Sequence, residues 1–375
     1  MKRKVCIYTM FGSTNYGSNF QAIGLSKTIE ELGYDVYLLD EFRVLSFFIR
    51  HPYLLLIRIV NRINRKKRRA FFDAIPYTIT DRRERRLERF KEDNFKLKKY
   101  RNAKEWQKDI NDNIIFVCGS DIIWNPSLGY PAINFLDVAF YAKLNRFSYA
   151  SSIGALELPR KYYKSLRKYL SSMKSIGVRE DSVANLLEPI IGRRPTKVID
   201  PSLFLSATKL ERYVNMAEIS IDISQTGYIL CYFVMSDKRY WEYIKQIKAK
   251  TKLQVVVLPM HRQDEIEEYS VVLDGTMNEF LWLIKNSTIV CTDSFHACVA
   301  STVFHKEFYL LKRSRNSENA KFEDFLSRYK LFDRVVGDEN VFVRKEKIDY
   351  DAIDELIKED VAFSIHFLRE SLRKC

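Results

Sequence analysis

Two successive series of alternating strand and helix patterns constrain the fold of this 375-residue chain more than any other feature of its sequence. The first series opens with a β-rich run at 4–9 (KVCIYT), a helical pattern at 20–32 and a second strand pattern at 34–39. A strand, a helix and a strand in succession predict a parallel sheet with helices on its faces. Further strand patterns follow at 113–118, 146–150, 175–178 and 196–199, with helical patterns at 81–108, 159–173 and 180–189.

The second series starts near Gly227 with GYILCYFV and continues through strand patterns as far as 307–311. Residues 206–226 carry no strong strand pattern, and the chain is longer than one core usually serves, so the boundary between two domains is expected there. We predict an α/β protein with two Rossmann-like domains that face a cleft. The predicted parts are an N-terminal domain at 1–210 with a basic apolar insertion at 42–104, a C-terminal domain at 211–345, and C-terminal helices at 346–375 that pack back on the first domain.

The composition excludes several classes of protein. With 46% hydrophobic residues the chain can bury sizeable cores and is not of disordered type. Six cysteines without CxxC spacing argue against a zinc site or a disulfide framework and suit a reducing compartment. The apolar run after the basic start is too short for a signal peptide, and no uncharged apolar stretch is long enough for a membrane-spanning helix. These features predict a cytoplasmic protein.

The positive charge is concentrated in one segment. Residues 58–104 hold 18 Lys and Arg against 6 Asp and Glu, whereas the whole chain carries a formal net charge of +14. Within the neighbouring stretch 42–70, apolar runs such as LLLIRIV lie next to the basic run RKKRR. Leu and Ile are more prominent there than the stacking aromatics of a nucleic-acid binder, so no nucleic-acid partner is expected. The segment predicts an interfacial helix on an anionic membrane surface; a buried helix with a basic end is the alternative.

Loops that follow parallel strands line the cleft between two such domains. After the strand pattern at 287–292, Asp293 or Ser294 can cap a helix whose first turn holds His296. A helix N-terminus with an imidazole suits an anion site. The alternative is that Asp293 and Ser294 only cap the helix and that His296 is a packing residue. Arg179, at the end of another strand pattern, can grip a carboxylate or phosphate with two hydrogen bonds, or form a surface pair with Glu180.

Two loops of the first domain are candidates for binding a sugar. In CGSDIIWNP (118–126), Asp121 and Asn125 can bind hydroxyls and Trp124 can stack on a sugar ring, or Asp121 can cap a helix while Trp124 fills the core. The turn NYGSNFQA (15–22) lacks GxGxxG and the Walker lysine, so it gives little support to a dinucleotide site. Three polar side chains of this turn are further candidates for binding the acceptor: Asn15, Tyr16 and Asn19. A plain helix cap is the alternative.

Taken together, these motifs resemble the polysaccharide pyruvyl transferase family. The resemblance covers most of the chain apart from roughly 41–110 and the last 30 residues. It rests on the order and spacing of seven pieces: NYGSNFQAIGL (15–25), GSDIIWNP (119–126), YASSIG (149–154), IGVRED (176–181), IDPSLFL (199–205), NEFLWLIKNSTIVCTDSFHACVAS (278–301) and KFEDFL (321–326).

The resemblance implies a GT-B-like pair of domains, phosphoenolpyruvate as donor and a hexose of a polysaccharide precursor as acceptor. It implies that Arg179 and His296 bind the donor, and that Lys321 matches a lysine which some members add. Ser294 stands where some members carry an arginine, so that donor contact is absent or comes from elsewhere, with Arg313 or Arg315 as candidates.

The chemistry of phosphoenolpyruvate then suggests roles. His296 is a phosphate ligand or the proton donor, and Asp121 serves the acceptor hydroxyls. No cofactor or metal is expected. The alternatives are a GT-B nucleotide-sugar glycosyltransferase and a non-catalytic carbohydrate-binding protein at the membrane. Repeat units built on a polyprenyl diphosphate carrier would place the protein peripherally on the inner face of the cytoplasmic membrane.

Overall fold

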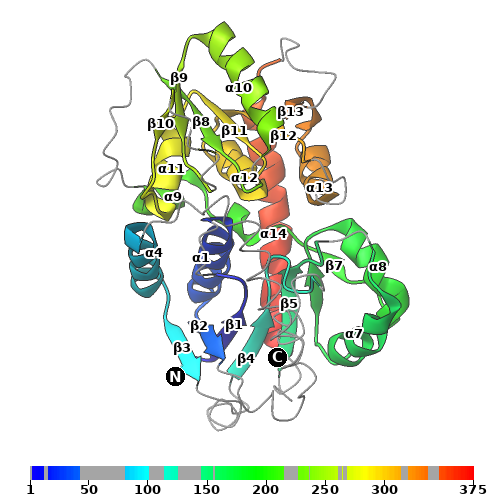
Figure 1. Ribbon diagram of the computed structural model, residues 1–375. Helices are drawn as coiled ribbons and strands as arrows, with labels where there is room; N and C mark the ends of the chain where they lie inside the picture. The colour runs from blue at the N-terminus through cyan, green and yellow to red at the C-terminus, as the bar shows by residue number, and fades with distance from the viewer. Residues whose placement is uncertain are drawn as a thin grey trace.

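The computed structural model contains two parallel β-sheets, one in each half of the chain (Figure 1). It describes residues 2–11, 16–42, 81–100, 114–125, 145–154, 157–214, 227–235, 237–260, 264, 268–313, 320–336 and 346–375.

The first sheet has seven parallel strands in the order β3-β2-β1-β4-β5-β6-β7. Its central strands are buried along their whole length because helices cover both faces, as parallel sheets require. The chain order reverses beside β1, which is the switch point where open α/β sheets bind ligands. The strands are β1 (Lys4–Tyr8), β2 (Asp35–Phe42), β3 (Leu97–Tyr100), β4 (Ile114–Cys118), β5 (Arg146–Ser151), β6 (Ile176–Val178) and β7 (Thr196–Lys197), and the helical elements are α1 (Tyr16–Glu31), α4 (Asp81–Asn94), η2 (Arg160–Tyr162), α7 (Tyr163–Leu170), α8 (Asp181–Ile191), η3 (Pro201–Phe204), α9 (Ala207–Leu210) and η4 (Glu211–Tyr213).

The second sheet repeats this arrangement with six parallel strands in the order β10-β9-β8-β11-β12-β13. Two Rossmann-like domains are therefore present, as predicted. The strands are β8 (Tyr228–Tyr232), β9 (Gln254–Val257), β10 (Ser270–Val271), β11 (Ile289–Thr292), β12 (Glu307–Leu311) and β13 (Val335–Val336), and the helical elements are α10 (Lys238–Thr251), α11 (Met277–Asn286), α12 (Phe295–Val303), α13 (Ala320–Arg328), η7 (Phe332–Arg334) and α14 (Tyr350–Lys374).

The long helix α14 joins the two domains. Figure 1 shows it running from the second sheet down to the first. Near its start, the exposed His305 ring lies 3.1 Å from Asp354. Farther along, the Ser364 hydroxyl accepts a hydrogen bond from the backbone N–H of Ile199 at 3.1 Å, and the carbonyl of Cys375 accepts one from Arg3. This helix therefore lies against the loop that follows β7.

Helices α1 and α4 of the first domain also contact the second domain. The Tyr16 hydroxyl donates to the carbonyl of Gly275 at 2.7 Å, and its ring stacks on Phe280 with centroids 5.0 Å apart. Arg83, fully buried, donates to the carbonyl of Pro259 at 2.7 Å, and Arg86 donates to Glu279 at 2.6 Å. Two arginines of the basic segment thus act in the contact between the domains.

The helix predicted at 81–108 needs correction. It ends at Asn94, and Leu97–Tyr100 forms β3, the edge strand beside β2. Lysine-rich edge strands are common because charge discourages pairing with other chains. The charge of the run KLKKY (96–100) is equally typical of a solvated helix, so it does not distinguish the two. Helix α1 also begins at Tyr16, four residues earlier than its apolar pattern.

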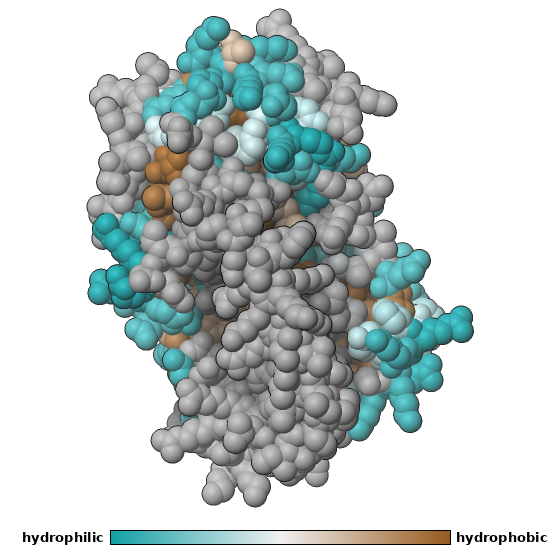
Figure 2. Space-filling model, in the orientation of Figure 1, coloured by the Kyte–Doolittle hydropathy of each residue, from teal (hydrophilic) through white to brown (hydrophobic). Residues whose placement is uncertain are grey.

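Polar residues gather on two parts of the described surface. Figure 2 shows polar residues over α10 and over the region of α7 and α8. Among the helices that the structure describes, none is long and apolar enough to cross a membrane.

Candidate functional site

The carboxyl ends of β6 and β7 carry the first half of the site. Strand β6 ends at Val178, so Arg179 and Glu180 follow it directly, and Glu180 precedes α8 as its N-cap residue. After β7 the chain reaches Asp200, whose side chain caps η3 by accepting from the N–H of Ser202 at 3.0 Å. Neighbouring parallel strands end at one edge of the sheet, which brings these side chains together.

Arg179 is buried among carboxylates. Its Nε donates to Glu180 Oε1 at 2.7 Å and its Nη1 to Asp200 Oδ2 at 3.0 Å, and Nη1 also lies 3.5 Å from Asp121 Oδ1. Burial would lower the pKa of Arg179, but these carboxylates outweigh it and raise the pKa above its usual value. Its guanidinium carbon lies 5.0 Å from the centroid of the Phe295 ring. Arg179 is therefore a fixed, permanent cation.

His296 brings the second domain to the same carboxylate. Its Nε2 is 3.5 Å from Asp200 Oδ2, within ion-pair distance, and makes no hydrogen bond to any part of the chain that the structure describes. Asp200 Oδ1 is held by the Ser202 hydroxyl at 2.6 Å. Burial would raise the pKa of Asp200, but its contacts with His296 and Arg179 outweigh burial and keep the pKa below its usual value. The carboxylate of Asp200 thus links the two predicted donor-binding side chains, Arg179 and His296.

The start of α12 fixes the position of the imidazole. Ser294 is the N-cap residue, and its hydroxyl accepts from the N–H of Ala297. Gly17, in the first turn of α1, lies so close that an added Cβ would come within 2.2 Å of His296 Nδ1. Only a glycine at that position lets α1 approach His296 in this way.

Arg313, a candidate for the missing donor contact, has partners in its own domain. Its Nη2 donates to the carbonyl of Asp293 at 2.8 Å, and its Nε lies 3.3 Å from Asp293 Oδ2. The same carboxylate accepts from the backbone N–H groups of Val234 and Met235. The contact therefore ties the ends of β8 and β11 together. Arg315 lies outside the described residues.

Several predicted acceptor-binding residues are buried, so they form no exposed sugar-binding surface in this structure. Trp124 is 2% exposed and packs in the core with Cys118 and Ile123, so its ring offers no face for stacking. Asn125 is 7% exposed, and Tyr16 and Asn19 are fully buried where α1 meets the second domain. The turn after Asp121 directs the chain inward, since the N–H of Trp124 donates to the carbonyl of Ser152.

Two further predicted residues are not placed. Asn15 lies outside the described residues. Lys321 belongs to α13, but its side chain lies outside the described part of the structure. Of the predicted set, the structure brings together Arg179, His296 and Asp121, with Ser294 capping the helix that carries the histidine.

Asp200 and Glu180 belong to the site although neither was among its predicted residues. Both had a signal in the sequence, because each follows a strand pattern directly and Asp200 stands in the piece IDPSLFL. The prolyl turn after Asp200 is equally typical of a strand that simply ends. Only the contacts of Asp200 with Arg179 and His296 distinguish a site residue from a cap.

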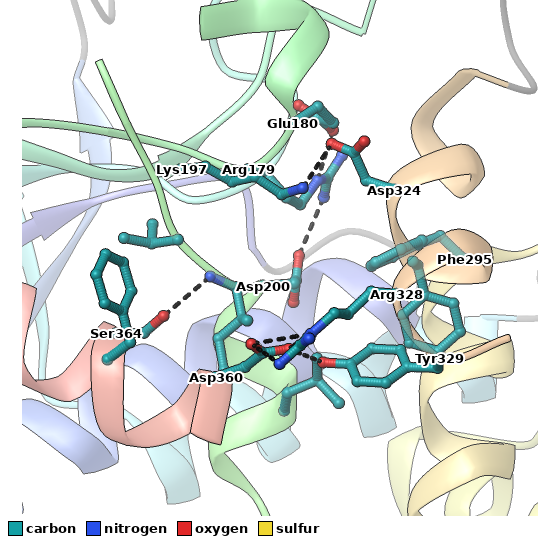
Figure 3. A pocket seen from close by; sticks show the side chains of 15 residues that line it. Arg179, Glu180, Lys197, Asp200, Phe295, Asp324, Arg328, Tyr329, Asp360 and Ser364 are labelled. Carbon is teal, nitrogen blue, oxygen red and sulfur yellow. Dashed lines mark hydrogen bonds and ion pairs between the residues drawn. The ribbon is translucent and has the colours of Figure 1, made fainter. Parts of the chain in front are cut away.

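A cavity of about 270 Å³ opens beside Arg179. Figure 3 shows its three walls: the ends of β6 and β7, the helix α13, and α14 with Asp360 and Ser364. The side chains around Arg179 form an ion cluster of five residues: Arg179, Asp121, Glu180, Asp200 and His296. Arg179, Asp200 and Phe295 line the cavity, so the cavity adjoins this ion cluster directly.

Comparison with solved structures identifies the fold. The UDP-GlcNAc 2-epimerase from Neisseria meningitidis bound to UDP-GlcNAc is 11% identical, with a TM-score of 0.50 over 100% of both chains. The S. aureus MnaA–UDP co-structure is 12% identical, with a TM-score of 0.50 over 97% of this chain and 90% of that one. At such identities the likeness shows the fold alone, and it confirms the predicted GT-B-like arrangement.

Comparison with sequences identifies the family. A search of curated proteins finds no match. The family model described as polysaccharide pyruvyl transferase matches residues 15–315, which include every residue of the ion cluster. The chain therefore belongs to the polysaccharide pyruvyl transferase family.

Proposed function

We propose that this enzyme transfers the pyruvyl group of phosphoenolpyruvate to two hydroxyls of a hexose in a surface-polysaccharide precursor and so forms a cyclic ketal. Family membership supports the reaction class. The observation that carries the donor assignment is the shared carboxylate of Asp200, which gathers Arg179 from one domain and His296 from the other. A small anion bound there would contact both domains.

Arg179 suits the donor carboxylate. Within the described part of the chain its hydrogen bonds use Nε and Nη1, which leaves Nη2 as a donor on a residue that lines the cavity. The neighbouring carboxylates hold the guanidinium in one orientation and keep it charged. An already oriented cation loses little conformational freedom when it binds a planar carboxylate.

The reaction needs one proton on carbon and the loss of two hydroxyl protons. Protonation of the methylene carbon gives an oxocarbenium-like centre, one acceptor oxygen attacks it, and the second displaces phosphate to close the ring. His296 is proposed as the proton donor or the phosphate ligand, and Asp121 as the base for a hydroxyl. Phosphoenolpyruvate and a diol thus give a ketal and phosphate.

The experiment that tests this function is thermal stabilisation by phosphoenolpyruvate compared with UDP-sugars, each at a concentration well above its expected Kd. A ligand that binds only the folded protein raises its melting temperature. Stabilisation by phosphoenolpyruvate, followed by acceptor-dependent release of phosphate, supports the proposal. Stabilisation by UDP-sugars alone would favour a glycosyltransferase instead.

Asp121→Asn should separate acceptor chemistry from donor binding. Removing a general base costs about 100-fold or more in turnover. Phosphoenolpyruvate should bind as tightly as before or more tightly, because a carboxylate 3.5 Å from Arg179 Nη1 has been neutralised. Asp354→Asn is the matched control, since that carboxylate is 40% exposed, pairs with His305 and does not line the cavity beside Arg179. Unchanged turnover in Asp121→Asn would show that Asp121 is not the base for an acceptor hydroxyl.

Peripheral membrane binding through 42–70 is a further part of the proposal. Residues 43–70 lie outside the described residues, so this prediction rests on the sequence. The protein should sediment with anionic liposomes at low salt and much less with neutral ones. Neutralising the five cations at 65–69 should remove about 1 kcal/mol of binding free energy per charge. Equal sedimentation with neutral liposomes would contradict an electrostatic contact.

A further inference from the structure

We infer that the cavity between β7, α13 and α14 is the subsite for an uncharged sugar ring of the acceptor. The role of the sugar as acceptor rests on the proposed function, whereas the binding of a sugar in the cavity does not. The cavity adjoins the ion cluster, because Arg179 and Asp200 belong to both. A ring in the cavity would therefore present hydroxyls toward the proposed donor site.

The charges around the cavity disfavour an anion. Three cations line it, and each is already paired: Arg179 as described, Lys197 with Asp181 at 2.7 Å, and Arg328 with Asp360 at 2.9 Å. Four carboxylates line the same space, so the lining carries a net negative charge: Glu180, Asp200, Asp324 and Asp360. A phosphate or carboxylate ligand that fills the cavity would meet this net negative lining, whereas the donor carboxylate needs only Nη2 of Arg179, where the cavity adjoins the ion cluster.

Sugar hydroxyls suit such paired charges. A hydroxyl donates one hydrogen bond and accepts others, so it can contact both members of an ion pair without leaving either charge unpaired. Glu180 Oε2 is buried and accepts no hydrogen bond in the part of the chain that the structure describes. A buried acceptor without a donor indicates a group that arrives from outside the chain.

The apolar walls suit the C–H face of a sugar ring. Phe295, Phe325 and Phe363 line the cavity, and Phe363 on α14 is 55% exposed. An exposed aromatic beside a polar cavity offers a stacking surface with little conformational entropy to lose. The loop at 118–126 does not offer one, because Trp124 is buried.

Phe363→Ala tests this subsite. The probes are methyl β-galactopyranoside, methyl β-glucopyranoside and methyl α-mannopyranoside, measured by saturation-transfer NMR without donor. The parent should bind at least one of them, and the variant should bind it about threefold to tenfold more weakly. Phosphoenolpyruvate-induced stabilisation should stay unchanged. Phe332→Ala is the matched control, because Phe332 is 54% exposed on η7 and does not line the cavity.

The possible outcomes separate this inference from the proposed function. Sugar binding that depends on Phe363, without any response to phosphoenolpyruvate, supports the subsite and contradicts the donor assignment. A loss of phosphoenolpyruvate binding in Phe363→Ala would make the cavity the donor site and overturn the inference. Sugar binding that is equal in the parent, Phe363→Ala and Phe332→Ala, or absent from the parent for all three probes, would overturn it as well.

Discussion

Arg179→Lys should weaken phosphoenolpyruvate binding about tenfold or more, and so should His296→Gln if His296 is a phosphate ligand. A lost charge-assisted hydrogen bond is worth about 1.5–3 kcal/mol, and 1.4 kcal/mol corresponds to a factor of ten. Lysine should fail at position 179 because an ammonium cannot reproduce a two-pronged grip on a planar carboxylate. The measurement is the concentration of phosphoenolpyruvate that gives half of the maximal thermal stabilisation.

His296→Gln also distinguishes the two proposed roles of the histidine. If His296 only binds phosphate, turnover at saturating donor largely survives. If it is the acid, turnover collapses while binding weakens little. Arg194→Lys and His305→Gln are matched controls, because both side chains are largely exposed and pair with carboxylates outside the cluster. Parent-like donor binding in both site variants would show that phosphoenolpyruvate does not bind at this cluster.

Asp200→Asn should lower the free energy of unfolding by about 3 kcal/mol, near the low end for breaking a buried ion pair. The low end applies because Arg179 keeps Glu180 at 2.7 Å. The folded-state pKa of Asp200 is lowered, so its contribution is present above the unfolded-state pKa of about 4 and is lost as the pH falls further. Urea denaturation of parent and variant at pH 7 and at a pH well below 4 measures both effects.

Asp200→Asn should also alter donor binding, because Asp200 positions the side chains of Arg179 and His296 and does not itself contact the donor. Without the shared carboxylate, the Arg179 and His296 side chains lose the atom that holds them together, so the KM for phosphoenolpyruvate should rise and the pH profile of turnover should shift. Glu188→Gln, which removes an exposed ion pair with Arg194, should cost less than about 1 kcal/mol. An Asp200→Asn protein with parent stability and an unchanged pH profile would contradict this account.

The sequence predicted the elements whose patterns are local. Strands such as β4 and β8 are continuous apolar runs because both faces of the sheet are covered, and that signal needs no knowledge of the rest of the chain. The edge strand β3 escaped prediction because its identity depends on pairing with β2, which is a distant contact. Its lysines alone are typical of a solvated helix.

The sequence by itself determined which side chains lie at strand ends, and hence that Arg179, His296 and Asp121 were candidates. It did not determine which way each loop turns afterwards. Trp124 enters the core because the chain folds inward after Asp121, whereas Asp200 contacts Arg179 in one domain and His296 in the other. Burial and ion pairing are properties of the assembled domains, so only the tertiary structure decided which candidates share one carboxylate and which are core residues.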